Sequence, residues 1–385
     1  MANKDPVKVG VLYSETGVTS AIESSQLLGT LLAIEDINDA GGIDGRELVP
    51  VRYNPASNPH MFRVLAERLV THDNVNTIFG CYMSSARKAV IPIVERHNRL
   101  LFYATLYEGF EFSNNIIYTG AAPNQNSVQL ADFMMSYFGG RVFLVGSDYI
   151  YPYESNRIMS DLVKQRPNGA TVAQRYVPVD VGAKGFDDIV QEIKAMQPDF
   201  IFSTVVGNAT QHFYRAYAEA GLNPKQMPIA SLTTSEVEVA QMGAAAAAGH
   251  FTAAPYFESI DCPENLQLLE RFRSRFSDSA HPNACWEAAY FQVRLFANAM
   301  QNTGTDMTSI LLPNLLGSDF LAPQGRVRIE PSNHHTHLYP RIGRVNSKGD
   351  FVIVRASTNA VAPDPYLVTH SLGDWTLALD SLEDA

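Results

Sequence analysis

The sequence predicts an α/β protein with two doubly wound parallel-sheet lobes joined by a multi-strand hinge. Short β-branched or aromatic runs alternate with longer segments of helical periodicity, which is the pattern of βαβ units on parallel sheets. The alternation occurs in two successive series, and 385 residues are too many for one ordinary core. The region after the second series is helical and then β-rich, so we expect it to return to the first lobe.

The first series opens with the run VKVGVLYS, whose β-branched residues predict a strand. Apolar residues at helical spacing follow, and this pattern stops at Gly41-Gly42. The run LLFYATLYEGFE, which begins at residue 100, starts as a buried strand and becomes a loop with a hydroxyl on every second residue from Tyr103 to Tyr107. We expect the first three strands at residues 7–14, 48–54 and 76–81, and helices around residues 22–37, 61–70 and 89–94.

The second series contains five further strand runs separated by helical patterns. The clearest of these helices is FDDIVQEIKAM, in which five apolar residues from Phe186 to Met196 share one face. Residues 263–316 are helical without intervening strands, the chain is β-rich from Pro323, and Ala244–Ala248 is expected to be a helix end or a loop. We expect the strands of this series at residues 141–147, 170–179, 199–207, 227–234 and 250–257.

This order of elements predicts how the chain divides between the lobes. The N-terminal lobe is expected to comprise residues 1–122 and 256–328. The C-terminal lobe and tail are expected to comprise residues 123–255 and 329–385. The strand ends of two such lobes face one another, so we expect a ligand cleft between them, with closure of the lobes on the ligand.

Composition restricts the class of partner. The formal net charge of −11 and the absence of a basic stripe argue against direct binding of nucleic acid. No apolar segment approaches the roughly 20 residues that span a bilayer, so no membrane partner is expected. The first ten residues lack the charged and apolar regions of a signal peptide, which predicts a cytoplasmic protein; a signal peptide removed before Met1 is the alternative.

Two short motifs suggest chemistry, and neither is complete. Ser85-Ala-Arg-Lys88 matches the S-x-x-K motif of penicillin-recognising enzymes, but the accompanying S-D-N and K-T-G motifs are absent, so we do not expect an enzyme. The segment His334-His335-Thr-His337 offers three imidazoles for a metal, but three ligands need convergent geometry and outer hydrogen bonds, so a solvated loop or interdomain hydrogen bonds are the preferred interpretation. We expect neither a metal nor a cofactor.

Neutral hydrogen-bonding groups recur where predicted strands end and helices begin. Each one alone is explained by helix capping or core packing, but their recurrence at equivalent strand ends favours a ligand site. The positions we expect to bind ligand are Tyr82, Ser84, Ser85, Tyr103, Thr105, Tyr149, Tyr151, Val205 and Thr233.

The chemistry of these positions predicts a small neutral ligand. An amide or urea carbonyl accepts from helix-end N–H groups or Thr105, its NH₂ group donates to hydroxyl or carbonyl oxygens, and aromatic rings bound a short alkyl chain. Four acids would invalidate this step if one of them bound a ligand ammonium group. They are Glu15, Glu108, Asp148 and Glu236.

Several segments together resemble a known family. The chain is similar to type I periplasmic binding proteins of the branched-chain amino acid class, and within them to the cytoplasmic amide sensors that negatively regulate aliphatic amidase operons. The stretches that carry this resemblance run almost from end to end: SETGVT, GCYMS with RKAV, YEGFE, APNQNS, GSDYIYP with ESN, FSTVVG, PIASLTTSE, APYF with SID, EAAY, APQG, DPY and the late DW.

The resemblance implies a sensor that binds a small aliphatic amide and, when empty, holds an RNA-binding antitermination regulator inactive. It implies the same site residues except Ser85 and Tyr149. The alternative is the urea- or short-amide-binding component of an ABC importer, which is similar through SARKAV, YEG, GAAPNQ and NHH but typically has tryptophan in place of Tyr82 and lacks DPYLVTHSLGDW. An amidase is the third class, and a homo-oligomer is possible.

The sequence departs from the amide sensors at two places beside the expected pocket. Leu106 stands where they have proline, and Ser85-Ala86 replaces a His-Thr pair. Both differences bear on which amide is preferred.

Overall fold

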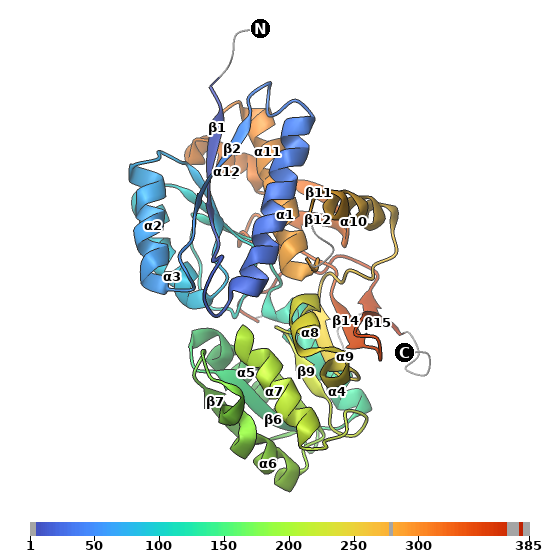
Figure 1. The fold of residues 1–385 in the computed structure, drawn as a ribbon. Helices are drawn as coiled ribbons and strands as arrows, with labels where there is room; N and C mark the ends of the chain where they lie inside the picture. The colour runs from blue at the N-terminus through green and yellow to red at the C-terminus, as the bar shows by residue number, and fades with distance from the viewer. Residues whose placement is uncertain (1–4, 277–279, 368–376, 380–385) are drawn as a thin grey trace. The chain divides into compact units, whose positions relative to one another are not determined.

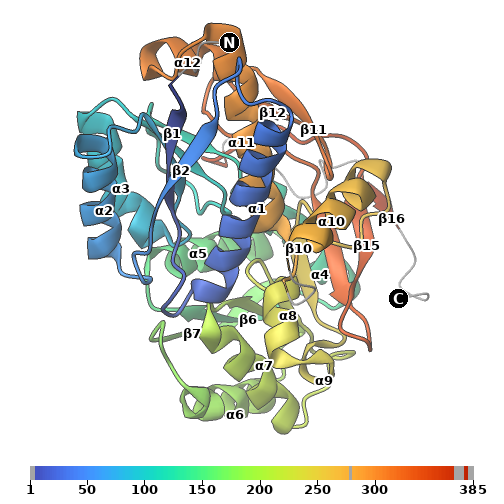
Figure 2. The ribbon, with the colours of Figure 1, turned by 45° about the horizontal axis from the view of Figure 1, so that its top comes forward.

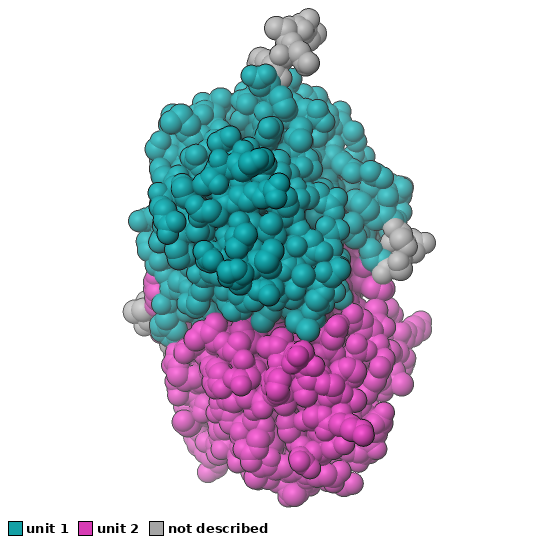
Figure 3. Space-filling model, turned by 60° about the vertical axis from the view of Figure 1, so that its left-hand side comes forward, with its two compact units in different colours: residues 1–120, 262–280, 284–338 teal, residues 121–261, 281–283, 339–385 magenta. Residues whose placement is uncertain are grey.

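The chain forms two compact units in the computed structural model, which describes residues 5–276, 280–367 and 377–379 (Figure 3). Unit 1 comprises residues 1–120, 262–280 and 284–338, and unit 2 comprises residues 121–261, 281–283 and 339–385. Each unit is built around a parallel sheet, so the predicted α/β class is confirmed.

The chain passes from one unit to the other mainly after residues 120, 261 and 338, whereas the sequence predicts these crossings after residues 122, 255 and 328. The third shows the largest difference, and pairing within unit 1 explains it. Strand β13 (Thr336–His337) pairs with β12 (Gly325–Ile329), and His335 forms a bridge with Tyr118. These bonds keep the chain in unit 1 for ten residues more than expected.

Five parallel strands form the main sheet of unit 1, in the order β2-β1-β3-β4-β5. All residues of β3, β4 and β5 are buried, and their apolar runs suit strands that are covered on both faces. A separate antiparallel sheet contains β11 (Asp319–Ala322), β12 and β13. The main-sheet strands are β1 (Val7–Leu12), β2 (Leu48–Tyr53), β3 (Thr77–Gly80), β4 (Leu100–Tyr103) and β5 (Ile116–Tyr118).

Helices cover both faces of the unit 1 sheet (Figures 1 and 2). Helices α2 (Pro59–Thr71) and α3 (Ser84–Arg96) lie on one side, and α1 (Ser20–Asp39) and α11 (Ala284–Thr303) lie side by side on the other. A Cβ at Gly29 of α1 would lie 2.4 Å from the Trp286 carbonyl oxygen, so only glycine permits this close approach. Helices α10 (Pro263–Arg275) and α12 (Thr308–Leu315) complete the unit.

The sheet of unit 2 repeats the same parallel order. Its parallel part runs β7-β6-β8-β9-β10, and β14, β15 and β16 extend it antiparallel beyond β10. The strand bounds are β6 (Arg141–Ser147), β7 (Ala170–Val177), β8 (Phe200–Thr204), β9 (Ile229–Ser231), β10 (Phe251–Ala254), β14 (Arg341–Val345), β15 (Phe351–Ser357) and β16 (Leu377–Leu379).

The helices of unit 2 follow the predicted pattern closely. The apolar face of α6 (Asp187–Met196) packs into a buried cluster with Phe213 and Ile201, as its spacing predicts. Ala244–Ala247 forms the short helix α9, which starts after Gly243. The remaining helices are η1 (Pro123–Gln125), α4 (Ser127–Tyr137), α5 (Ile150–Lys164), η2 (Ala183–Phe186), α7 (Asn208–Glu219) and α8 (Glu236–Met242).

No helix within the described ranges combines the length and apolar character that crossing a membrane requires.

Candidate functional site

Both parallel sheets change winding direction at an equivalent point. In unit 1 this point lies between β1 and β3, and in unit 2 it lies between β6 and β8. Open α/β sheets bind ligands outside the carboxyl ends of the strands at such a point. The nine predicted site residues all follow or end strands at these edges: Tyr82, Ser84 and Ser85 after β3, Tyr103 and Thr105 at the end of β4, Tyr149 and Tyr151 after β6, Val205 after β8, and Thr233 after β9.

The first turn of α3 presents backbone N–H groups near the end of β3. Helix α3 begins at Ser84, its N-cap residue is Met83, and no side chain caps it. The N–H groups of Ala86 and Arg87 donate to the Met83 carbonyl oxygen. The positive end of the helix dipole therefore lies beside Ser84 and Ser85, where an oxygen acceptor is favoured.

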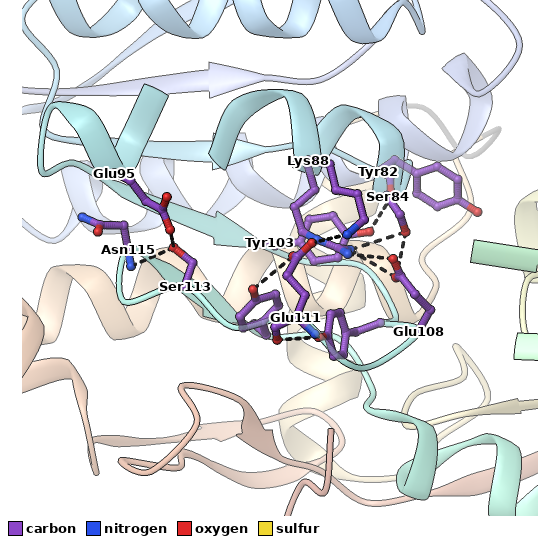
Figure 4. Close-up of polar contacts among 12 residues, drawn as sticks. Tyr82, Ser84, Lys88, Glu95, Tyr103, Glu108, Glu111, Ser113 and Asn115 are labelled. Carbon is purple, nitrogen blue, oxygen red and sulfur yellow. Dashed lines mark hydrogen bonds and ion pairs between the residues drawn. The ribbon is translucent and has the colours of Figure 1, made fainter. Parts of the chain in front are cut away.

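A buried ion cluster lies behind this turn (Figure 4). The Arg87 side chain is fully buried, and its Nη2 donates to Glu108 Oε1 at 2.8 Å. Arg87 Nε donates to Glu111 Oε1 at 2.8 Å, and Lys88 Nζ pairs with Glu111 Oε2 at 2.6 Å. Two cations and two carboxylates are thus paired, so the cluster carries no net charge.

The surroundings keep Arg87 charged. Burial acts to lower its pKa, but Glu108, Tyr103 and Glu111 together raise it well above the usual value. The guanidinium carbon lies 4.7 Å from the centre of the Tyr103 ring and 5.0 Å from that of Tyr107. Tyr103 and Tyr107 therefore share one side of the chain, as their spacing predicts, but that side faces a buried cation.

Three of the predicted hydroxyl groups of unit 1 have fixed hydrogen-bond partners. Ser84 Oγ donates to Glu108 Oε2 at 2.8 Å, and Tyr103 OH donates to the Tyr82 carbonyl oxygen at 2.6 Å (Figure 4). Thr105 Oγ1 accepts from Gln26 Nε2 at 2.9 Å. Ser85 Oγ is buried and has no hydrogen-bond partner within the described part of the chain.

Hydroxyl and backbone groups form the corresponding network in unit 2. Thr233 Oγ1 donates to the Val205 carbonyl oxygen at 2.9 Å. Ser231 Oγ accepts from the N–H groups of Thr233 and Thr234 at 3.0 and 3.1 Å. Thr234 Oγ1 lies 3.0 Å from Tyr214 OH, so four hydroxyl-bearing side chains fix the turn after β9.

The two predicted tyrosines after β6 differ in exposure. Tyr149 is the N-cap residue of α5 and is partly exposed, whereas Tyr151 is buried. Their ring centres lie 6.2 Å apart, so they belong to one aromatic group. Tyr153, which follows them, is exposed and donates its hydroxyl proton to Asp148 Oδ1.

Of the four acids that could overturn a neutral ligand, three have clear structural partners. Glu108 pairs with Arg87, Glu15 pairs with Arg52 at the surface, and Asp148 accepts from Tyr153. The fourth, Glu236 at the start of α8, accepts from the Glu258 N–H at 2.9 Å, and burial raises its pKa to about 8. Burial therefore disfavours the charged form of the Glu236 carboxyl.

The three histidines of the possible metal motif have separate contacts. His334 Nδ1 lies 3.3 Å from the Ile116 carbonyl oxygen, and His337 Nε2 lies 2.9 Å from Glu330 Oε2. The His335 ring stacks on Tyr118 at 4.2 Å, and burial lowers its pKa well below the usual value. No group of three potential metal ligands occurs among the residues that the structure describes.

Arg87, Glu111 and Glu23 were not among the residues predicted to shape the site. Two spacings signal the ion cluster: Arg87 lies three residues after Ser84 on α3, and Glu108 and Glu111 lie three apart after the neighbouring strand. Glu23 of α1 is buried and accepts from the Ser14 N–H at 2.7 Å and from Thr19 Oγ1 at 2.5 Å. No spacing of residues around Glu23 in the sequence indicates this role.

The family comparison gives one match that spans nearly the whole chain. A model described as a periplasmic binding protein domain matches residues 7–372. The Leu/Ile/Val-binding protein homolog 6 of Brucella melitensis is 24% identical over 340 residues, which cover 87% of this chain and 86% of that protein. A Pseudomonas aeruginosa protein that binds leucine, isoleucine, valine, threonine and alanine is 23% identical over 84% of this chain and 85% of its own length.

A further match is local. A stretch of 133 residues is 31% identical to the limonene hydroxylase of Geobacillus stearothermophilus, and it spans 34% of this chain and 24% of that protein.

Solved structures share the fold. A solute binding protein of an ABC transporter from R. palustris, in complex with 4-hydroxybenzoate, has a TM-score of 0.82 at 20% identity and covers 93% of this chain and 96% of its own. The branched-chain amino acid binding protein LivJ of Streptococcus pneumoniae, in complex with isoleucine, has a TM-score of 0.79 at 18% identity and covers 90% of this chain and 99% of its own. At these sequence identities the similarity establishes the fold. The identity of the ligand has to be inferred from the residues of the site.

Proposed function

The chain belongs to the periplasmic binding protein domain family, and on that premise we propose that it is a receptor for a small neutral amide or urea. The family is one of binding proteins rather than enzymes, so the bound solute is not converted. The neutral ion cluster beside Ser84 carries this proposal: its buried cation is already paired with two carboxylates.

The paired cluster distinguishes this site from one that binds a carboxylate ligand. A benzoate or the carboxylate of an amino acid is best held by an unpaired Arg or Lys, because a charge-assisted bond is about twice as strong as a neutral one. Arg87 donates to Glu108, Glu111 and Ser84, so few of its N–H groups remain to bind a ligand anion. The other predicted site residues offer phenol, hydroxyl and backbone groups, which suit an amide.

Calorimetry tests this assignment with acetamide, propionamide, butyramide, urea, leucine and 4-hydroxybenzoate. A ligand of about four non-hydrogen atoms contributes at most roughly −6 kcal/mol, so we expect a dissociation constant of tens of micromolar or weaker for an amide or urea. Tight binding of leucine or 4-hydroxybenzoate, with no heat from any amide, would contradict the proposal.

The role that follows from the family relatives is delivery of the amide to an ABC transporter. Relatives with the same fold are solute binding proteins of such transporters, including the one from R. palustris in complex with 4-hydroxybenzoate. If this role is right, the protein is exported from the cytoplasm and copurifies with a permease.

A second role rests on the sequence motifs shared with amide sensors. In that role the empty protein sequesters an RNA-binding antitermination regulator in the cytoplasm, and amide binding releases it. Part of the supporting motif, residues 368–375, lies outside the described residues. Affinity purification from the native cell, with and without amide, separates the roles: an RNA-binding protein lost on adding amide supports the sensor, and a permease supports the transporter.

A further inference from the structure

The direction of the hydrogen bonds at the candidate site can be read from the acceptors. Carboxylate and backbone carbonyl oxygens cannot donate, so a hydroxyl group bonded to one of them must use its own proton. This applies to Ser84 beside Glu108, to Tyr103 beside the Tyr82 carbonyl, and to Thr233 beside the Val205 carbonyl. What these hydroxyl oxygens can still offer a ligand is a lone pair; at Ser84, one lone pair accepts from Arg87 Nη1 at 3.4 Å and the second remains for the ligand.

Ser84 is the most firmly oriented of the three. Its acceptor, Glu108, is only 2% exposed, and Arg87 holds Glu108 through Nη2 at 2.8 Å and Nη1 at 3.3 Å. Arg87 is held in turn by Glu111. The loop between the two carboxylates turns through Gly109 and Phe110, both with positive φ, and so brings Glu108 and Glu111 to the same guanidinium.

We propose that Glu108 is a specificity-determining residue: by taking the Ser84 proton, it makes Ser84 an acceptor that selects ligands with an NH₂ group over carboxylates of the same shape. This inference rests on the proposed function, since it concerns how the same site chooses among small solutes. An amide donates its N–H to Ser84, and its carbonyl oxygen accepts from the N–H groups of Ser84 and Ser85 at the start of α3 and from Ser85 Oγ, since the next two N–H groups donate to the Met83 carbonyl. A carboxylate presents only lone pairs to Ser84, and an unmade bond there costs about 1–3 kcal/mol.

The test compares propionamide with propionate, which have nearly the same shape, by calorimetry at pH 7. The wild type is expected to bind propionamide roughly 5- to 150-fold more tightly, the ratio that corresponds to about 1–3 kcal/mol. In Glu108→Gln the side-chain NH₂ group donates to Ser84 and frees the Ser84 proton for the ligand. The preference for propionamide is therefore expected to fall by about tenfold or more.

Glu95→Gln is the matched control. Like Glu108, Glu95 accepts a hydrogen bond from a serine: its Oε1 accepts from Ser113 Oγ at 2.8 Å. Glu95 lies on α3 at the opposite end of that helix from Ser84 (Figure 4). Glu95→Gln is expected to keep the wild-type ratio. Ser84→Ala covers the case in which Glu108→Gln does not fold, because it leaves the Arg87–Glu108 pair intact and removes the acceptor; its ratio is expected to fall as well.

The possible failures are distinguishable. If the wild type binds amide but the ratio is unchanged in folded Glu108→Gln or in Ser84→Ala, the role of Glu108 is wrong and the proposed function stands. If the wild type binds propionate more tightly than propionamide, or binds neither them nor urea, the proposed function falls and the role of Glu108 with it.

Discussion

Units 1 and 2 repeat one strand order but fix the polar groups at their strand ends by different means. Unit 1 uses a buried ion cluster, in which Arg87 bonds to Glu108, Glu111 and Ser84. Unit 2 uses hydroxyl and backbone groups, among them Ser231, Thr233 and Thr234. Two sheets of the same topology therefore hold their strand-end residues in different ways, one by buried ion pairs and the other by neutral hydrogen bonds. The two ways differ in how much stability is lost when one bonding partner is removed.

The difference follows from what happens when one partner is lost. A buried ion pair that loses a member leaves an uncompensated charge, whereas a neutral hydroxyl that is lost leaves an acceptor that often has a second donor. The Val205 carbonyl, for instance, accepts from Thr210 Oγ1 as well as from Thr233 Oγ1. Unit 1 is thus expected to be the more sensitive to single substitutions.

The largest effect is expected for Arg87→Met, which leaves Glu108 buried without its cation. The free energy of unfolding should fall by about 3–5 kcal/mol, measured by urea denaturation at pH 7. Arg157→Met in unit 2 is the control, because Arg157 pairs with Glu154 and Asp161 on the exposed surface of α5 and should cost less than about 1 kcal/mol. Equal losses in the two variants would contradict the proposed contrast.

The next effect concerns pH and Glu23 in unit 1. Burial raises the pKa of Glu23 from 4.5 to about 7, despite the bonds from Thr19 and Ser14. Between these values the carboxyl of Glu23 loses its proton in the unfolded chain and keeps it in the folded chain, so the contribution of Glu23 to stability is complete below pH 4.5 and is lost as pH rises to 7. The loss attributable to Glu23 is of order 3 kcal/mol, at about 1.36 kcal/mol per pKa unit.

Urea denaturation of the wild type and Glu23→Gln at intervals from pH 4.5 to 8 measures this effect. The difference between the two curves isolates Glu23, because glutamine does not titrate. Burial raises the pKa of its titratable neighbours Tyr13 and Cys81 above their usual values, so neither ionises in this range. Parallel curves for the two proteins would show that the pKa of Glu23 is the same in the folded and unfolded states, and would contradict the predicted effect of burial.

The fold could be predicted from the sequence because its signals are local. Strand β6 was predicted with the bounds that the structure has, and α6 was predicted from one apolar face. Strands β11 and β13 were not predicted as separate elements, since they are short and depend on pairing with β12 rather than on their own composition. The third crossing was displaced for the same reason.

The site could be predicted only in part. The sequence located Ser84, Tyr103 and Thr233 at strand ends, because strand ends and turn residues are visible in the pattern. It did not show that Arg87 reaches Glu108, since the two residues lie 21 positions apart and meet only through the pairing of β3 with β4. The binding of ligand by all nine predicted residues stays a prediction.

The smallest effects are expected for a matched pair, Thr105→Val in unit 1 and Thr233→Val in unit 2. Thr105→Val leaves Gln26 Nε2 with only a 3.3 Å bond to the Ala104 carbonyl, so it should cost about 1 kcal/mol of stability. Thr233→Val should cost less, roughly 0.5 kcal/mol, because the Val205 carbonyl keeps its bond from Thr210.

Measuring the ligand affinity of the two variants shows whether each threonine binds ligand or has only a structural role. Both substitutions keep the shape of the side chain and remove its hydroxyl group, so each should weaken propionamide binding in calorimetry by several-fold if its residue contacts ligand. An unchanged affinity in a folded variant would remove that residue from the site. If Thr233→Val proved the more destabilising of the pair, the bond from Thr210 to the Val205 carbonyl would not compensate for the loss of the bond from Thr233.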